Sequence, residues 1–597
     1  MTRPTLHRFS ALFTRVRALL EARRVAAFAV VLAVVLVLPS VGSGLVTEEF
    51  VQRDLVRHGK YHLPGYVNLF GHEHPWSAVD VAQRNYQYEL FGWFPWFTDK
   101  RFDASFWRPL SSWTHQIDYR LFPNAAALMH AENLAWYALL VFFAGLLYRR
   151  LLPSRWVAGL AAVLYAVDDA HGHAVGWITN RNGLMATAFA VIALWAYDRF
   201  RRDGWMWGAV LTPVFIALGL GSAEFALCAS GYFLAHALFV DRAPAGRRIV
   251  ASTTWAVVFA GWLVLYRGLG YATHGSGLYI DPLHDPAQYL SAFSERAAIL
   301  ITATLGAPPA DLWTRSGPYL QGFLVLWSAV FVAGVGWVLW PLFRTNARAR
   351  FFAAGLVLSL PPACATFAED RLLLFAGLGA MPLVALVIAS LFEDAPWTLE
   401  RRGSSQALGV AWLGVHLVVA PLLLPYRSLH MYRYQHELDD ADASLFSHVK
   451  FGANEALVVV NGRDDYFAGV LPLLRAARGL PDVGRLITLS GSLDDVEIRR
   501  LDERRIWVHP KYGFYSRVFN RLYRGRDNPL VRKSVVELAG VNVIVDDVDQ
   551  WGEPTAVVFE FQYPLENPAY KWVVWHDDRY DTFVPPKVGT SVTVEHA

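Results

Sequence analysis

The sequence predicts a polytopic α-helical membrane protein with a C-terminal soluble α/β domain. Of its 597 residues, 54% are hydrophobic and only 18% are charged, which is too apolar for a soluble chain of this length. The 23 Trp, 25 Tyr and 37 Phe residues suit the membrane interfaces, where aromatic rings gather. Apolar runs of helical length recur from residue 25 to residue 426, so we expect one transmembrane domain followed by one tail domain.

The first apolar run begins at Val25 and follows a short segment rich in arginine. Because this run is long enough to cross a membrane and many more follow, it predicts an uncleaved anchor, with residues 1–24 in the cytoplasm. We expect about eleven spans, at residues 25–45, 127–148, 154–168, 182–198, 206–221, 223–240, 249–267, 319–342, 351–367, 371–392 and 407–426.

This count places the later arginine-rich loops on the cytoplasmic side, as the positive-inside rule requires. The loops are YRRLLPSR, RFRRDG, DRAPAGRR, RTNARAR and LERRGSS. If the apolar stretch from Tyr289 to Pro309 also crossed the membrane, RTNARAR would change sides, so we assign this stretch to an external loop at residues 268–318. A larger, aromatic external loop spans residues 46–126 and is expected to lie along the membrane surface.

Two weaker signals limit the functional classes. The net charge of +3 is mild and the arginines sit in topology loops, so nucleic acid is not an expected partner. Cys228 and Cys364 each lie inside an apolar run, which favours two buried, unpaired thiols over a disulfide or a metal pair.

Four groups of polar residues fall on the predicted external face: VTEEF, DDAHGHAVGWITNRN, GSAEF and FAEDR. Ionisable groups at the ends of membrane spans are costly to desolvate and often mark sites. Solvated loop ends are the plain alternative for any one group taken singly, but four groups on one face favour a site. The external face is therefore expected to carry the chemistry.

Several of these segments resemble the GT-C membrane glycosyltransferases, especially relatives of the protein O-mannosyltransferases and of bacterial enzymes that use dolichyl- or polyprenyl-phosphate sugars. The segments are FWRPLSSWTHQIDYRLFPNAAALMHAENLAWYALL, LYAVDDAHGHAVGWITNRNGLMA, LGLGSAEFAL and AEDRLLLFAGLGAMPLVA. The resemblance covers roughly residues 40–395, and its matching positions include Arg108, Pro109, Asp118, Tyr119, His130, Asn133, His171, Val175, Trp177, Arg181 and Leu184.

The chain also departs from the family pattern. Glu48 and Glu49 stand where the family usually has a pair of aspartates after the first span. His173 replaces the glutamate of the family's second loop, and Asp168 and Asp169 replace its His-Pro.

The resemblance implies a GT-C-like fold and sugar transfer from a polyprenyl-phosphate donor with inversion of the anomeric carbon. Glu48 or Glu49 would be the general base, with Asp54 as a competing candidate. The donor phosphate would be held by guanidinium groups, which bind it in a planar, two-pronged manner. The candidates for this role are Arg108, Arg181 and Arg371, with Asp169, His171, His173, Glu224, Glu369 and Asp370 as supporting residues.

Each of these residues also has a structural alternative. Arg371 can be an ion-paired helix end, Arg181 a helix cap and Glu224 a buried turn residue. The spacing of His171 and His173 resembles a metal-ligand pair but lacks a fourth ligand. No metal site and no cofactor are therefore assigned, and a divalent cation is left open.

The tail at residues 427–597 is predicted to be a small external α/β domain that could bind the acceptor. Buried strands are expected at EALVVVNG, RLITLSG, RIWVHP, NVIVDD, AVVFEF and KWVVWHD. A helix is expected at YFAGVLPLLRAARG, ending at Gly479, and NGRDD is interpreted as a strand-to-helix turn.

Together these observations predict a glycosyltransferase in a bacterial-type inner or plasma membrane. Its partners would be a polyprenyl-phosphate sugar, membrane lipids and an acceptor whose identity the residues do not reveal. A non-catalytic relative that binds lipid-linked saccharide or assists envelope assembly is the alternative. A transporter ranks third, because the spans show no inverted repeat.

Overall fold

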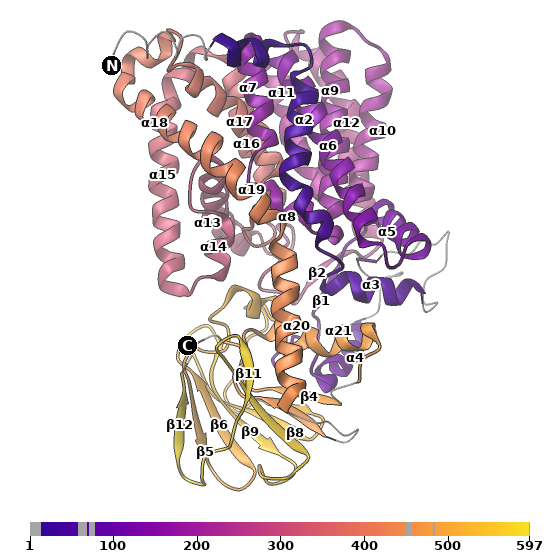
Figure 1. Ribbon diagram of the computed structural model, residues 1–597, viewed down its shortest axis with the longest axis vertical. Coiled ribbons are helices and arrows are strands. Elements are labelled where there is room, and N and C mark those ends of the chain that lie inside the picture. The colour runs from indigo at the N-terminus through magenta and orange to yellow at the C-terminus, as the bar shows by residue number, and fades with distance from the viewer. Residues whose placement is uncertain are drawn as a thin grey trace.

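In the computed structural model, a bundle of helices occupies one end of the molecule and a β-rich domain the other (Figure 1). The structure describes residues 14–57, 69–70, 78–448, 455–481, 484–492 and 494–595. Part of the predicted cytoplasmic segment, residues 1–13, therefore lies outside the described residues.

Each of the eleven apolar runs forms one, two or three consecutive helical segments. In chain order these are α2 (Val25–Val37) with η1 (Leu38–Gly42), α6 (Ala126–Leu151), α7 (Arg155–Ala166), α9 (Arg181–Asp203), α10 (Trp207–Ser222), η3 (Glu224–Cys228) with α11 (Ala229–Phe239), α12 (Ala245–Gly268), α15 (Pro318–Thr345), α16 (Ala347–Ala363), α17 (Leu374–Ala389), and α18 (Arg402–Gly414) with η6 (Val415–Val419) and α19 (Ala420–Ser428).

Within the described residues, five helical segments are long and apolar enough to cross a membrane: Val25–Gly42, Ala126–Leu151, Ala245–Gly268, Pro318–Thr345 and Pro396–Ser428. The other apolar helices are shorter or less apolar, so the count of eleven crossings stays a prediction. The chain is an integral membrane protein.

The outer helices of the bundle expose apolar side chains and the inner helices are buried, as expected for a helix bundle in a membrane. Helices α12, α15 and α19 expose large apolar side chains, for example Val264 at 73% and Leu422 at 72%, which suits contact with lipid. Helices α9 and α17 are buried along most of their length and form the centre of the bundle. Cys228 and Cys364 are buried free thiols, as predicted.

The two long loops meet each other at the end of the bundle that faces the β-rich domain (Figure 1). The 46–126 loop contains α3 (Thr47–Arg57), α4 (Ala78–Phe91), β1 (Asp103–Ser105) and α5 (Pro109–Leu121). The 268–318 loop contains β2 (Ala272–His274), α13 (Pro286–Leu305) and α14 (Ala310–Arg315). Strands β1 and β2 pair antiparallel, with Ala104 opposite Thr273, and so join the two loops.

The tail begins with α20 (His430–His448), which the sequence analysis did not anticipate and which runs from the bundle to the β-rich domain (Figure 1). A four-stranded sheet has the order β11 (Arg579–Thr582), β10 (Tyr570–His576), β3 (Ala456–Val459) and β4 (Arg485–Thr488). A six-stranded antiparallel sheet has the order β12 (Ser591–Val594), β5 (Val496–Arg500), β6 (Arg505–Pro510), β9 (Pro554–Phe561), β8 (Val541–Val548) and β7 (Val535–Leu538).

The predicted helix of the tail is α21 (Asp465–Arg478), and local chemistry sets both of its ends. The Asp464 side chain accepts a hydrogen bond from the Phe467 N–H at 2.6 Å and so caps the first turn. Gly479 ends the helix with φ +70°, a conformation that glycine adopts without steric cost. NGRDD therefore forms the strand-to-helix turn that its sequence indicates.

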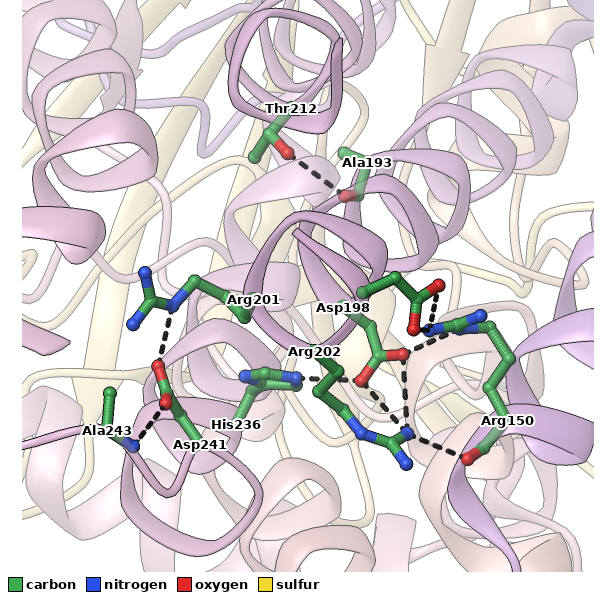
Figure 2. A network of polar contacts seen from close by, with 10 residues as sticks. Arg150, Ala193, Asp198, Arg201, Arg202, Thr212, His236, Asp241 and Ala243 are labelled. Carbon is green, nitrogen blue, oxygen red and sulfur yellow. Dashed lines mark hydrogen bonds and ion pairs between the residues drawn. The ribbon is translucent and has the colours of Figure 1, made fainter. Parts of the chain in front are cut away.

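A buried ionic network ties three membrane helices together (Figure 2). The Asp198 carboxylate of α9 contacts Arg150 Nε of α6 at 2.6 Å and His236 Nε2 of α11 at 3.0 Å. The side chains of Asp198 and His236 are fully buried. Because the carboxylate is their shared acceptor, removing it would leave the buried imidazole unpaired and would leave Arg150, whose side chain is 23% exposed, with its second partner, Asp203.

Asp198→Ala should therefore lower the free energy of unfolding by about 1–3 kcal/mol, the cost of leaving a buried hydrogen-bonding group without its partner. Thermal unfolding in detergent measures the effect. Asp203→Ala is the matched control, because Asp203 also pairs with Arg150 but is 42% exposed. Equal losses of thermal stability in the two variants would contradict a structural role for the buried carboxylate.

Candidate functional site

A cavity of about 450 Å³ lies where the two long loops meet the ends of the membrane helices. We call it the loop cavity. It brings together three of the predicted site residues, Arg108, Glu224 and Arg371, which are far apart in the sequence. Aromatic and aliphatic side chains form most of the remaining wall: Phe106, Phe225, Leu227, Trp262, Leu263, Tyr266, Tyr279, Ile280, Leu283, Tyr289 and Leu372.

Arg108 immediately precedes α5 and pairs with Glu224 at the start of η3. Arg108 Nε lies 2.9 Å from Glu224 Oε2, and Nη2 bonds the second oxygen, so the pair is two-pronged. The guanidinium also lies over the Phe106 ring, 4.5 Å from its centroid. These contacts fix Arg108 in the wall of the loop cavity.

Arg371 lies in η4 (Asp370–Leu372), far from Arg108 in the sequence, and lines the same cavity. Its Nε bonds the Glu369 carboxylate. The guanidinium lies between two aromatic rings, 5.6 Å from the Trp177 centroid and 5.4 Å from that of Phe367. Cation–π contacts of this kind orient the planar group without using all of its donors.

A third pair, Arg267 and Asp281, lines the loop cavity and was missed by the sequence analysis. Arg267 Nη2 donates to Asp281 Oδ1 at 2.5 Å, and the Leu283 N–H donates to the same oxygen at 2.9 Å. Although burial opposes it, these hydrogen bonds hold the pKa of Asp281 below its ordinary value. The segment RGLGYATHGSGLYID has no sequence feature that marks it as a site. Its first residue, Arg267, and its last, Asp281, come together only when the loop folds.

A second, more polar cavity of about 440 Å³ adjoins the first. The two share Thr273, Tyr279, Ile280 and Asp281 in their walls. The second cavity is lined by polar groups from both long loops and from the tail, including Arg101, Asp103, His274, His284, Asp285 and Asp527. Asp281 therefore faces a mostly apolar cavity on one side and a polar one on the other.

Next to the loop cavity, Arg427 at the end of α19 holds three carboxylates. Its Nη1 lies 2.8 Å from Asp169 Oδ2, and its Nη2 lies 3.1 Å from Asp311 Oδ2 and also bonds Asp370. Helix α8 (His171–Gly176) packs closely on this end of α19, and a Cβ at Gly176 would lie 1.9 Å from the Ser428 carbonyl oxygen. The predicted residues Asp169 and Asp370 thus have a structural partner, and neither lines the loop cavity.

His171 and His173 are both buried in α8. A His171 ring nitrogen lies 3.1 Å from the Tyr137 hydroxyl, and the His173 ring stacks on Trp177 at 5.6 Å. Burial lowers the pKa of His171 to about 3 and that of His173 well below its ordinary value, so both rings are neutral. No group of three or more His, Cys, Asp or Glu side chains in the described part of the chain is arranged to hold a metal ion.

Arg181 has a different environment from the other two predicted phosphate ligands. Its side chain has no exposed surface, and Nη1 lies 2.7 Å from Asp118 and 2.8 Å from Glu132. Nε donates to Asn133 at 2.9 Å. Because these partners join α9 to α5 and α6 and Arg181 does not line the loop cavity, we assign it a structural role.

The three predicted base candidates lie on α3, and none of them lines the loop cavity. Glu49 is fully buried; it accepts the Val46 N–H at 2.6 Å and the Thr179 N–H at 3.0 Å, one on each oxygen. Glu48 Oε1 accepts the Tyr466 hydroxyl of α21 at 2.6 Å. Asp54 is partly buried one and a half turns further along the helix.

Burial raises the pKa of Glu49 to about 8, from an ordinary value of 4.5. The folded state therefore binds a proton that the unfolded state releases, and its contribution to stability is lost as pH rises from about 4.5 towards 8. Glu49→Gln should remove this slope, which is at most about 1.4 kcal/mol per pH unit. Thermal unfolding of both proteins between pH 5 and 8 checks it; a stability difference that does not change with pH would contradict a buried, protonated Glu49.

No protein-family model matches the chain. A stretch of 112 residues is 28% identical to the protein O-mannosyl-transferase Tmtc1 of Drosophila melanogaster, and this match spans 19% of the chain and 13% of the relative's length.

Two solved structures align with the fold. The Archaeoglobus fulgidus oligosaccharyltransferase tethered to an acceptor peptide aligns with a TM-score of 0.32 and 12% identity, over 78% of this chain and 65% of that one. ArnT from Cupriavidus metallidurans in the apo state aligns with a TM-score of 0.34 and 13% identity, over 76% of this chain and 89% of that one.

The match to Tmtc1 agrees with the motif resemblance found in the sequence. Over these 112 residues the chain is similar to a protein O-mannosyl-transferase.

Proposed function

We propose that the chain is a membrane glycosyltransferase that moves a sugar from a polyprenyl-phosphate donor to an acceptor on the external face, with inversion of the anomeric carbon. One observation carries the proposal: the loop cavity combines a largely apolar wall with the guanidinium groups of Arg108, Arg267 and Arg371. A lipid-linked sugar phosphate has the same combination of an apolar chain and an anionic group.

The cavity wall suits the lipid part of such a donor. Leu263 on α12 is 36% exposed and Leu283 is 69% exposed, and both line the loop cavity. In a membrane, these side chains would be covered by hydrocarbon, which gives an isoprenoid chain an apolar path into the cavity.

Arg371 is our candidate for the main phosphate ligand. Arg371 bonds Glu369 through Nε. Arg108 uses both Nε and Nη2 to bond the two carboxylate oxygens of Glu224. Arg371 also has a hydrogen bond with the Tyr279 side chain, which is a neutral partner. A phosphate therefore competes with fewer carboxylate contacts at Arg371 than at Arg108.

The reaction needs a stabilised leaving group and one base. The bond between the anomeric carbon and the phosphate oxygen breaks, the lipid phosphate keeps the electron pair, and the arginines stabilise its charge. The acceptor oxygen forms the new bond and gives its proton to a carboxylate. Asp281 is our candidate for this carboxylate, because it lines both cavities and the polar one suits a hydroxyl-bearing acceptor. Glu48 and Glu49 remain the candidates that the family resemblance implies.

A non-catalytic protein that binds lipid-linked saccharide is the second candidate function. The observation in its favour is that Glu49 and Glu48 are both occupied by hydrogen bonds that link α3 to neighbouring segments. If the protein is a transferase, substitution of one carboxylate should abolish transfer while donor binding persists. A non-catalytic protein would bind the donor but show no transfer in any variant, including the wild type.

Arg371→Lys keeps the charge but loses the planar fork, and Arg371→Ala loses both. If Arg371 holds the donor phosphate, each variant should bind the donor lipid about 10- to 150-fold more weakly, since a charge-assisted contact contributes about 1.5–3 kcal/mol. Titration with a polyprenyl-phosphate sugar in detergent measures this. Arg505→Lys, in an exposed ion pair with Asp502, is the control. Unchanged donor affinity in both Arg371 variants, at unchanged thermal stability, would exclude the phosphate role.

Asp281→Asn should reduce release of polyprenyl phosphate from radiolabelled donors by about 100-fold or more while leaving donor binding intact, because a general base contributes about 10²- to 10⁴-fold. Glu48→Gln and Glu49→Gln, assayed beside it in membranes, are expected to keep transfer. If either glutamate variant loses transfer while Asp281→Asn keeps it, that glutamate of α3 is the general base and Asp281 is not. Full transfer in all three variants would exclude Asp281, Glu48 and Glu49 as the base and would leave Asp54 as the remaining candidate.

A further inference from the structure

We propose that a second site, between α13 and the tail domain, binds a small oxyanion: a phosphate or carboxylate group on a ligand no larger than a sugar phosphate. The site is a cleft of about 250 Å³, which we call the arginine cleft. Its walls come from α13, α14 and the start of α15 on one side and from residues 515–529 and 551–553 on the other. It shares only Ile280 with the loop cavity, and the proposal does not depend on transferase activity.

The charge of the cleft is strongly one-sided. Five arginines and two glutamates line it, and Arg517 is also paired with Asp494 at 3.1 Å, which leaves an excess of two positive charges in a small volume. The charged residues are Arg296, Arg517, Arg521, Arg524, Arg526, Glu295 and Glu553. A cleft lined by one sign of charge focuses its field and concentrates ions of the opposite sign.

Two of these arginines are buried and contact backbone carbonyls. Arg296 is 5% exposed and donates to the carbonyls of Cys364 at 3.0 Å and Leu278 at 3.2 Å. Arg524 is 9% exposed and donates to the carbonyls of Thr98 at 3.0 Å and Asn528 at 2.9 Å. Within the described residues, neither has a carboxylate oxygen within 4.0 Å. Carbonyl dipoles orient these cations without neutralising their charge, so an anion in the cleft would be stabilised.

The remaining groups leave room for an added acceptor. A single carboxylate, that of Glu553, serves two guanidinium groups: Arg521 Nη2 at 3.2 Å and Arg526 Nε at 2.9 Å. The Tyr515 hydroxyl, in a side chain that is 5% exposed, has no hydrogen-bond partner among the described residues. A phosphate or carboxylate offers two or three oxygens to such donors at once.

The size of the cleft limits the ligand. A volume of about 250 Å³ is below the range of about 300–1,000 Å³ typical of pockets for drug-sized molecules. An anionic group with at most one sugar ring fits this volume, whereas a folded partner does not. Trp313 and Trp551 also line the cleft, and their indole faces are suited to the apolar face of a sugar.

Calorimetric titration of the full-length protein in an uncharged detergent tests the proposal, with inorganic phosphate and glucose 6-phosphate as probes and glucose as the neutral control. The two phosphates should bind, with an affinity that falls as salt rises, and glucose alone should not. Arg521→Gln and Arg526→Gln, at partly exposed positions that should tolerate the change, should each weaken binding about tenfold.

Glu553→Gln gives the sharpest test, because it should strengthen phosphate binding by freeing two arginines from their shared carboxylate. Arg505→Gln, outside the cleft, should leave the affinity unchanged. The absence of phosphate binding at millimolar concentrations, or equal affinities in wild type, Arg521→Gln and Glu553→Gln, would overturn the proposal.

The same titration in nanodiscs distinguishes two sources of the oxyanion. If phosphatidylglycerol nanodiscs abolish the binding seen in phosphatidylcholine nanodiscs, a lipid headgroup occupies the cleft. Equal binding in both identifies a soluble ligand. Either result supports an oxyanion site.

Discussion

The geometry of the loop cavity depends on the contact between one guanidinium group and three carboxylates. Arg427 contacts Asp169, Asp311 and Asp370, which come from the α7–α8 connection, α14 and η4. Without a cation between them, three carboxylates this close would repel one another strongly. The Asp370 side chain is only 1% exposed and also accepts the Ala310 N–H at 2.7 Å. With Asp370 held on one side of η4, its neighbour Arg371 lines the loop cavity on the other.

The arginines of the loop cavity would need little change to bind the anionic ligand that we propose. Arg108, Arg267 and Arg371 are each paired with a carboxylate, since an unpaired charge beside the membrane would be costly. Aromatic rings around Arg108 and Arg371 hold the guanidinium planes in place. A phosphate would then join an existing pair as a further acceptor, and little reorganisation would be needed on binding.

The tail domain contributes directly to the candidate sites. Asp527 of the tail lines the polar cavity, and residues 515–529 form one wall of the arginine cleft. The Tyr466 hydroxyl donates to Glu48 and joins α21 of the tail to α3, at the start of the first long loop. The polar cavity and the arginine cleft therefore have walls from both the loops and the tail, whereas the walls of the loop cavity come from the membrane helices and the loops. Helix α20 connects the two parts of the chain (Figure 1).

Composition and the spacing of apolar runs were sufficient to predict the helical membrane domain, the two long loops and the α/β tail. These features follow from local properties: hydropathy over about twenty residues, arginines in short loops, and caps such as Asp464 and Gly479. The strands β5, β7, β11 and β12 were missed because they are only four or five residues long and are stabilised by pairing with their neighbours. The polar helix α20 was also missed.

The roles of individual site residues were decided by the tertiary structure. Arg108 and Glu224 are 116 positions apart, and Arg427 and Asp169 are 258 positions apart, so no local pattern could pair them. The sequence placed Arg108, Arg181 and Arg371 in one class, but packing buries Arg181 between helices and leaves the other two in a cavity wall. Residue type determined which side chains can carry the chemistry. Burial and long-range pairing decided which of them line a cavity. The sequence could not show this, because solvent access and neighbouring charges are set only in the folded chain.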